Sequence, residues 1–147
     1  MVDIDDLKKV FENAIDETND STVEYLTSGK IQEHKTKIFD EMNLNMRERE
    51  RAHKSLKFYR YISDLNEFKY GMFIRWYSLK KFKQRELKLE MGGFISDIKI
   101  VTDDVHIICK NIFGKHVQIK IGENIIFQKI TDQEKVIISV VDYVNKK

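Results

Sequence analysis

The chain has 147 residues, of which 41% are hydrophobic, so it can bury one core as a single domain or as a small domain with an appendage. Charged residues make up 34%, a proportion typical of long exposed helices, and the absence of proline excludes a proline-rich linker or ligand motif. No apolar run approaches the roughly 20 residues that span a bilayer, and the acidic N-terminus does not resemble a signal peptide. We therefore expect no membrane insertion.

Charge is distributed unevenly along the chain, although the formal net charge is only +2. Residues 1–50 hold 13 acidic and 7 basic side chains, whereas residues 51–90 hold 11 basic and 4 acidic ones. The acidic part of one copy could pair with the basic part of another, or the basic part could bind a polyanion such as DNA or RNA. Cys109 is the only cysteine, which excludes an intrachain disulfide and predicts a reducing, intracellular compartment.

Residues 1–67 are predicted to form a helical arm. Apolar residues at helical spacing follow Asp3, and Ser21 with Glu24 forms a capping box, so two short helices are expected at the start of the arm. Residues 30–66 contain no glycine or proline and are rich in good helix formers. This composition predicts either one long helix or two helical segments.

A seven-residue spacing of apolar side chains runs through residues 30–66 and gives the arm some coiled-coil character. Lys35 and Arg49 occupy positions that a regular coiled-coil seam would fill with apolar residues. We therefore expect this segment either to bind partner proteins or further copies of the chain, or to lie against the chain's own β-domain.

Residues 68–147 are predicted to form a small β-barrel domain that ends in a helix. Candidate strands with alternating apolar side chains cover Tyr70–Leu79, Phe94–Val101, Asp104–Lys110, Lys115–Ile121 and Ile125–Ile130. Five short antiparallel strands predict an SH3-like barrel, with an OB-like barrel as the alternative, and the fold class is α+β. Thr131 and Glu134 form a capping box for the final helix, which we expect to plug or cover the barrel.

The alternation of side chains also predicts how the strands pair. Ile107 is expected to face inward, opposite Ile98 on one neighbouring strand and Ile119 on the other. A turn at residues 122–124 is expected to pair Ile119 with Phe127, which would join the last two strands in a hairpin. Every partner in this register is apolar, as a sheet with one buried face requires.

No catalytic or metal-binding constellation emerges from the residue types. Cys109 and His116 are close in sequence, but the register directs the thiol into the core and the imidazole outward. The sequence has no CxxC or HxxxH pair for zinc and no glycine-rich phosphate loop. The Gly92-Gly93 pair predicts a bend or bulge at the start of a strand. We expect no catalytic residue, no metal and no cofactor.

The strongest binding candidate is the segment 69–88, which combines aromatic and basic side chains after a core-facing series that includes Trp76. The residues expected to face outward, or to follow the strand in a basic loop, are Phe73, Arg75, Tyr77, Lys80, Lys81, Lys83, Arg85 and Lys88. Aromatic rings stack on bases and cations neutralise phosphates, so these residues predict a nucleic-acid or partner-binding site. Alternatively, the helices cover Phe73 and Tyr77 and the lysines are only solvated, or the segment binds an acidic protein.

Three stretches, Lys69–Arg75, Leu89–Gly93 and Asn124–Lys129, are together similar to small helix-plus-β proteins of large double-stranded DNA viruses. The resemblance implies a viral setting, such as a virion or assembly component, and it implies no catalytic residue. The long charged helical segment and the lack of a catalytic constellation predict a non-enzymatic structural or assembly protein. Nucleic-acid binding through residues 69–88 is the alternative function.

Overall fold

The computed structural model describes residues 27–145, and the chain divides into two compact units. The β unit is the continuous segment Phe58–Lys129. Among the described residues, the helical unit combines residues 27–57 with residues 130–145. The predicted division after residue 67 therefore lies inside the β unit, and the predicted helices near Asp3 and Ser21 lie outside the described residues.

The helical unit contains α2 (Ser28–Glu41), α3 (Met46–Ser55) and α5 (Asp132–Asn145) among the described residues. Residues 30–66 thus do not form one helix. The chain turns after α2 at Asn43, which adopts a left-handed conformation with φ of 55°. The next helix begins with a capping box, in which Asn45 Oδ1 accepts from Glu48 N at 2.8 Å and Glu48 Oε1 accepts from Asn45 N at 3.0 Å.

The C-terminal helix packs within the helical unit. The predicted capping box is confirmed: Thr131 and Glu134 exchange two hydrogen bonds of 3.1 Å between their side chains and backbone amides. Ile137 is fully buried, in a cluster with Ile31 of α2. Within the helical unit, the apolar stripe of α5 therefore packs against the apolar face of α2.

The lysine that interrupts the predicted seam has a structural role. Lys35 is only 2% exposed, and its Nζ donates to the backbone oxygen of Leu56 at 3.0 Å. Leu56 is the C-terminal cap of α3, where unpaired carbonyl groups favour a cation. Two contacts therefore join α2 and α3. The first is the hydrogen bond from Lys35, and the second is the edge-on contact of Phe39 with His53, whose ring centroids are 4.8 Å apart.

The histidine in this contact gives the helical unit a dependence on pH. Burial, followed by the charges of Lys35 and Arg49, lowers the pKa of His53 from its usual 6.5. The unfolded chain therefore protonates at a higher pH than the folded chain, so the free energy of unfolding should fall as the pH drops through 6.5 and level off below the folded pKa.

We expect His53→Gln to flatten this dependence in urea unfolding measured between about pH 8 and pH 5, the range in which histidine titrates. His34→Gln, which changes an exposed histidine of α2, is the control and should keep the wild-type profile. Equal pH profiles for wild type and His53→Gln would contradict this assignment.

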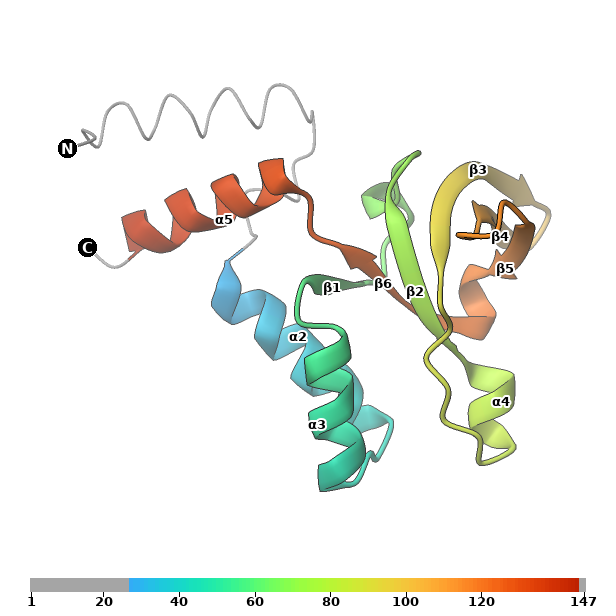
Figure 1. Cartoon of the computed structure of the whole chain (residues 1–147), viewed down its shortest axis with the longest axis horizontal. Coiled ribbons are helices and arrows are strands. Elements are labelled where there is room, and N and C mark those ends of the chain that lie inside the picture. Colours follow the sequence, from blue (N-terminus) through green and yellow to red (C-terminus); the bar gives the residue numbers. More distant parts are fainter. Residues whose placement is uncertain (1–26, 146–147) are drawn as a thin grey trace. The chain divides into compact units, whose positions relative to one another are not determined.

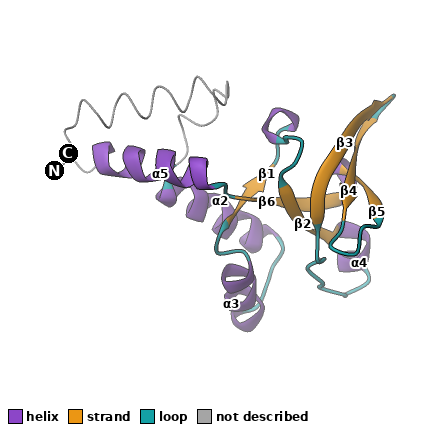
Figure 2. Ribbon diagram, turned by 45° about the horizontal axis from the view of Figure 1, so that its top comes forward, coloured by secondary structure: helices purple, strands orange, loops and turns teal. Residues whose placement is uncertain are grey.

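The β unit contains a six-stranded antiparallel sheet. Its strands are β1 (Tyr59–Ile62), β2 (Phe73–Ser78), β3 (Gly93–Val101), β4 (Asp104–Lys110), β5 (His116–Lys120) and β6 (Asn124–Lys129). The short helix α4 (Leu79–Lys83) follows β2, and the 3₁₀ turns η2 (Leu65–Glu67) and η3 (Ile121–Glu123) precede β2 and β6. The strand order is β1-β6-β2-β3-β4-β5, so the sheet is open, with β1 and β5 at its edges (Figures 1 and 2).

The α+β class is confirmed, but the predicted closed five-stranded barrel is wrong. A sixth strand, β1, lies in the segment that was expected to be helical. The predicted hairpin between the last two strands does not form, because β6 pairs with β1 and β2 instead of β5. The turn η3 explains this: Gly122 does not adopt the positive φ that a tight hairpin turn needs, and the chain crosses to the other side of the sheet.

The inner face of the sheet carries the core, and the register predicted for the middle strands is confirmed. Ile107 lies opposite both Ile98 and Ile119. The buried residues of this core are Ile62, Phe68, Ile74, Trp76, Ile95, Ile107, Cys109, Ile119 and Ile126. The prediction that Cys109 and the even-numbered positions of β2 face inward is therefore confirmed.

A buried ion pair holds η2 against the sheet. Arg60 of β1 is 3% exposed, and its guanidinium lies 2.5 Å from Glu67 Oε2. Gln128, the cross-strand neighbour of Arg60, donates from Nε2 to the backbone oxygen of Glu67 at 3.3 Å. Buried charges need such partners, so these contacts fix the segment that leads from β1 to β2.

Candidate functional site

The predicted binding residues of β2 are held in place by the rest of the β unit. Tyr77 lies on the face opposite Trp76 but is only 5% exposed, and its ring makes an edge contact with Phe127, with centroids 6.1 Å apart. Phe73 and Arg75 are half-buried. The outward side of β2 is therefore not a continuous row of exposed aromatic and basic groups.

The segment that follows α4 folds back along β2 and is anchored through Glu90. The backbone amide of Glu90 donates to the oxygen of Trp76 at 2.9 Å, and Arg75 Nε donates to the oxygen of Glu90 at 3.0 Å. The side chain of Glu90 accepts from Lys81 Nζ at 2.7 Å. This hydrogen bond, together with the charge of Glu90, raises the pKa of Lys81. Two of the predicted cations, Arg75 and Lys81, thus serve to anchor the returning chain.

Gly92 allows this return because it lies directly against β2. Its φ is +87°, and a Cβ at this position would lie 2.0 Å from the backbone oxygen of Ile74 and 2.9 Å from Arg75 Cγ. No side chain fits at that distance, so only glycine can occupy the position without moving backbone. The predicted bend at Gly92-Gly93 is confirmed, and the register of β3 shifts shortly afterwards, between Ile95 and Asp97.

The remaining predicted cations form an exposed basic segment. The expected loop begins with α4, whose first turn is capped by Ser78 Oγ, and the helix is followed by Arg85 in a left-handed conformation with φ of 63°. The exposed cations of the segment are Lys80, Lys83, Arg85 and Lys88. They are not interleaved with exposed aromatic rings, so their contribution to binding is mainly electrostatic.

Large apolar side chains are exposed where β2 and β3 begin. Tyr70 is 63% exposed, Met91 64% and Phe94 53%. The ring of Phe94 packs edge-on against Phe73, with centroids 5.0 Å apart, and its cross-strand neighbour on the other side is Lys110. We call Tyr70, Phe73, Met91 and Phe94 the apolar cluster. They lie in two segments that are joined by hydrogen bonds of 2.8 Å from Gly71 N to Ile95 O and from Ile95 N to Met72 O, and by the pairing of Ile74 with Gly93.

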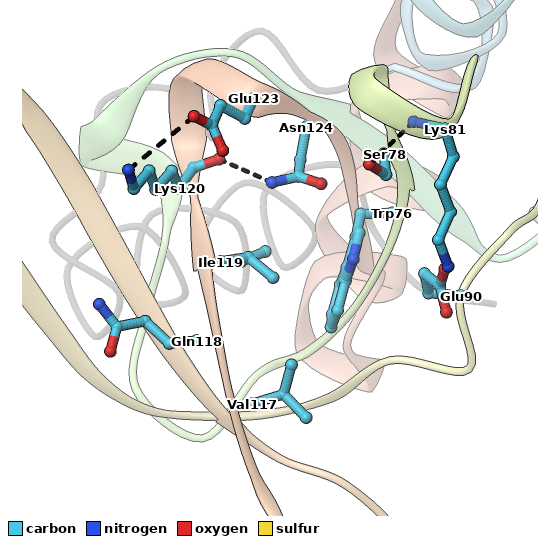
Figure 3. Close-up of a pocket in the computed structure, with 10 residues that line it drawn as sticks. All are labelled: Trp76, Ser78, Lys81, Glu90, Val117, Gln118, Ile119, Lys120, Glu123 and Asn124. Carbon is cyan, nitrogen blue, oxygen red and sulfur yellow. Dashed lines mark hydrogen bonds and ion pairs between the residues drawn. The ribbon is translucent and has the colours of Figure 1, made fainter. Parts of the chain in front are cut away.

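A cavity of about 450 Å³ opens beside Trp76 on the inner side of the sheet (Figure 3). Its lining residues are Trp76, Ser78, Lys81, Glu90, Val117, Gln118, Ile119, Lys120, Glu123 and Asn124. Figure 3 shows Trp76 with the Lys81–Glu90 pair on one side and the side chains of Val117 and Ile119 on the other. The sequence did not reveal this cavity, because it depends on the separation of β5 from β6.

The described residues contain no cluster of metal ligands, and the thiol of Cys109 is buried. Among residues 27–145, no group of three or more His, Cys, Asp or Glu side chains could hold a metal ion. Burial raises the pKa of Cys109 to about 12, so this thiol stays protonated and unreactive at neutral pH. His116 is exposed and lies opposite Lys110, as the register predicted.

No known protein family, curated protein or solved structure matches the chain. In the part of the chain that the structure describes, no helix combines the length and the apolar character needed to cross a membrane.

We expect Gly92→Ala to lower the free energy of unfolding by about 3 kcal/mol or more, because a steric clash adds to the backbone strain of a positive φ. Gly71→Ala is the matched control: Gly71 has a similar φ of +82°, but no atom lies within 4 Å of its hypothetical Cβ. This control should cost only about 1–2 kcal/mol. Urea unfolding measures both values, and equal costs would show that the contact with Ile74 does not constrain the fold.

Proposed function

We propose that the chain is a non-enzymatic structural or assembly protein whose β unit binds protein partners through the apolar cluster. The exposure of Tyr70, Met91 and Phe94 carries this proposal. Large apolar side chains gathered on a folded surface are characteristic of protein interaction sites, and aromatic residues contribute much of the binding energy at such sites. The Phe73–Phe94 ring contact holds one of these side chains ready for binding.

The helical unit supplies a second surface for assembly in this proposal. Exposed charged side chains dominate α3, and Met46 at its start is 81% exposed. The resemblance of three short stretches to proteins of large double-stranded DNA viruses stays a prediction, and on it we propose a virion, or the assembly of one, as the setting. A second copy of the chain is the simplest partner with which the proposal can be tested.

We expect the purified protein to associate with increasing concentration and Phe94→Glu to weaken that association at least about tenfold, since one buried aromatic residue often contributes more than 1.4 kcal/mol at an interface. Sedimentation velocity from micromolar to near-millimolar protein measures the change in mass. Ile100→Glu is the control, because Ile100 is also exposed, at 78%, but lies near the far end of β3.

A protein that stays monomeric over this concentration range would contradict self-assembly through the apolar cluster. Equal weakening by Phe94→Glu and Ile100→Glu would show that the effect comes from general surface hydrophobicity or charge and does not belong to the cluster.

Nucleic-acid binding is the second candidate function, and the exposed basic segment supports it. The β unit holds 13 basic and 8 acidic residues, and Lys80, Lys83, Arg85 and Lys88 lie within nine consecutive positions. Because Tyr77 is buried and Arg75 is bound to the Glu90 backbone, we expect phosphate contacts with little base stacking.

We expect any affinity for single-stranded DNA or RNA to fall with salt, with a logarithmic slope of about −0.7 per phosphate contact. Charge reversal in the triple variant Lys80→Glu, Lys83→Glu, Lys88→Glu should abolish binding in a fluorescence-anisotropy titration. The control with the same change in net charge is Lys37→Glu, Arg47→Glu, Arg51→Glu, on exposed positions of the helical unit. If the Lys80→Glu, Lys83→Glu, Lys88→Glu variant still bound nucleic acid, the basic segment would be excluded as the binding site.

A further inference from the structure

Among residues 27–145, the strand β5 ends the sheet, and none of the strands described there pairs with its outer backbone edge. At the turn from β4, Asn111 N donates to Lys115 O at 2.9 Å, and Lys115 N donates to Asn111 Oδ1 at 2.9 Å, so the N–H and C=O groups of Lys115 are directed toward Asn111. In an antiparallel ladder hydrogen-bonded pairs alternate with non-bonded pairs. His116, Gln118 and Lys120 are the non-bonded partners of β4, and their N–H and C=O groups therefore point toward the open edge.

One further contact supports this assignment. The backbone oxygen of Lys120 accepts a hydrogen bond of 2.8 Å from Asn124 Nδ2, a residue on the far side of η3. That oxygen is thus directed away from β4, as the alternation requires. The chain itself covers the end of the edge at Lys120, so His116 and Gln118 provide the open backbone groups.

The cavity beside Trp76 borders this edge. Four consecutive residues of β5, from Val117 to Lys120, line it. Side chains of consecutive strand residues alternate between the two faces, so a cavity lined by all four borders the backbone edge as well as the inner face. Figure 3 shows Ile119 directed toward Trp76 and Gln118 directed away from it. A strand placed along this edge would send every second side chain toward the cavity.

We propose that the open edge of β5 binds an extended segment of a protein partner, which adds as an antiparallel strand and carries alternating apolar and acidic residues. The apolar residues would enter the cavity beside Trp76, between Val117 and Ile119. The acidic residues would share the face of His116, Gln118 and Lys120. Strand addition of this kind takes affinity from backbone hydrogen bonds and specificity from the pockets for alternate side chains.

The charge of the side chains along β5 favours an acidic partner strand. Residues 115–120 contain no acidic side chain and include Lys115, His116 and Lys120. The nearest acidic contact of Lys120 is Glu123, at a long 3.9 Å. A second copy pairing edge to edge about Gln118 would bring the lysines of both copies to one ribbon, and residues 115–120 of neither copy would supply an acidic side chain to pair with them. An acidic partner strand meets the same positions with opposite charge. None of these residues belongs to the apolar cluster, so this site does not depend on self-association.

The test uses the full-length chain labelled with ¹⁵N and a nine-residue peptide of alternating glutamate and valine with blocked ends. We expect shifts and slower hydrogen exchange at the amides of His116 and Gln118. The same peptide with lysine in place of glutamate should bind at least about tenfold more weakly, since each charge pair changes from attractive to repulsive. No binding of the glutamate peptide, equal binding of both peptides, or shifts confined to residues 79–88 would overturn the proposal.

A matched pair of variants isolates the backbone edge. Gln118→Pro removes the outward N–H, whereas Gln118→Ala changes only the side chain, and proline is tolerated at an edge position whose N–H faces solvent. We expect about tenfold weaker binding by Gln118→Pro than by Gln118→Ala, the loss of about one hydrogen bond. Equal affinities would overturn the proposal.

Modified peptides give the same test with the wild-type chain, should the proline variant not fold. In an antiparallel strand the glutamates lie opposite Gln118, so their N–H groups bond to β5, while those of the valines point away. N-methylation of the glutamates should abolish binding and N-methylation of the valines should preserve it. The reverse result, or no difference between the two peptides, would exclude strand addition at this edge.

Discussion

The contact between Gly92 and the Ile74 carbonyl is the constraint on which the candidate site depends. It brings the chain back against β2 closely enough for Glu90 to bond with Trp76, Arg75 and Lys81. Those bonds tie the side chains of Arg75 and Lys81 to the returning chain, and Lys81 and Glu90 line the cavity. The same return places Leu89 in a β-bridge with Tyr77, which helps to cover that ring. The residues that were expected to form one binding surface therefore have different roles. Arg75 and Lys81 anchor the returning chain, whereas the cations of the basic segment stay exposed.

The open sheet follows from the position of β6 between β1 and β2. Once the chain has crossed through η3, β5 keeps an open edge, and the interior beside Trp76 is accessible between β5 and the start of β6. Open edges invite pairing with other chains, and proteins commonly protect them with charge or short length. The strand β5 has only five residues, with Lys115 directly before it and Lys120 at its end. The short length limits pairing in general, and the lysines favour an acidic partner strand over a second copy.

Sequence patterns within short segments predicted the parts of the fold in which neighbouring elements of the chain contact each other. The pairings of β3 with β4 and of β4 with β5 follow from side-chain alternation across short turns. The division of residues 30–66 into α2 and α3 could also have been predicted, because the sequence places Asn45 and Glu48 at the spacing of a capping box. The central position of β6 had a signal in the consecutive apolar residues Ile125–Phe127, which are typical of a strand buried on both faces. The role of Gly92 had no signal in the sequence, because it depends on the carbonyl of Ile74, which comes near Gly92 only in the folded sheet.

The central claim is that the apolar cluster, and not the basic segment, is the main assembly surface. Hydrogen-exchange mass spectrometry of the full-length protein at a low and a high concentration tests it most directly, because it locates the surface that association covers. We predict slower exchange at high concentration in peptides that cover residues 69–73 and 91–95, with residues 79–88 unchanged. Protection confined to residues 79–88, or identical exchange at both concentrations, would contradict it.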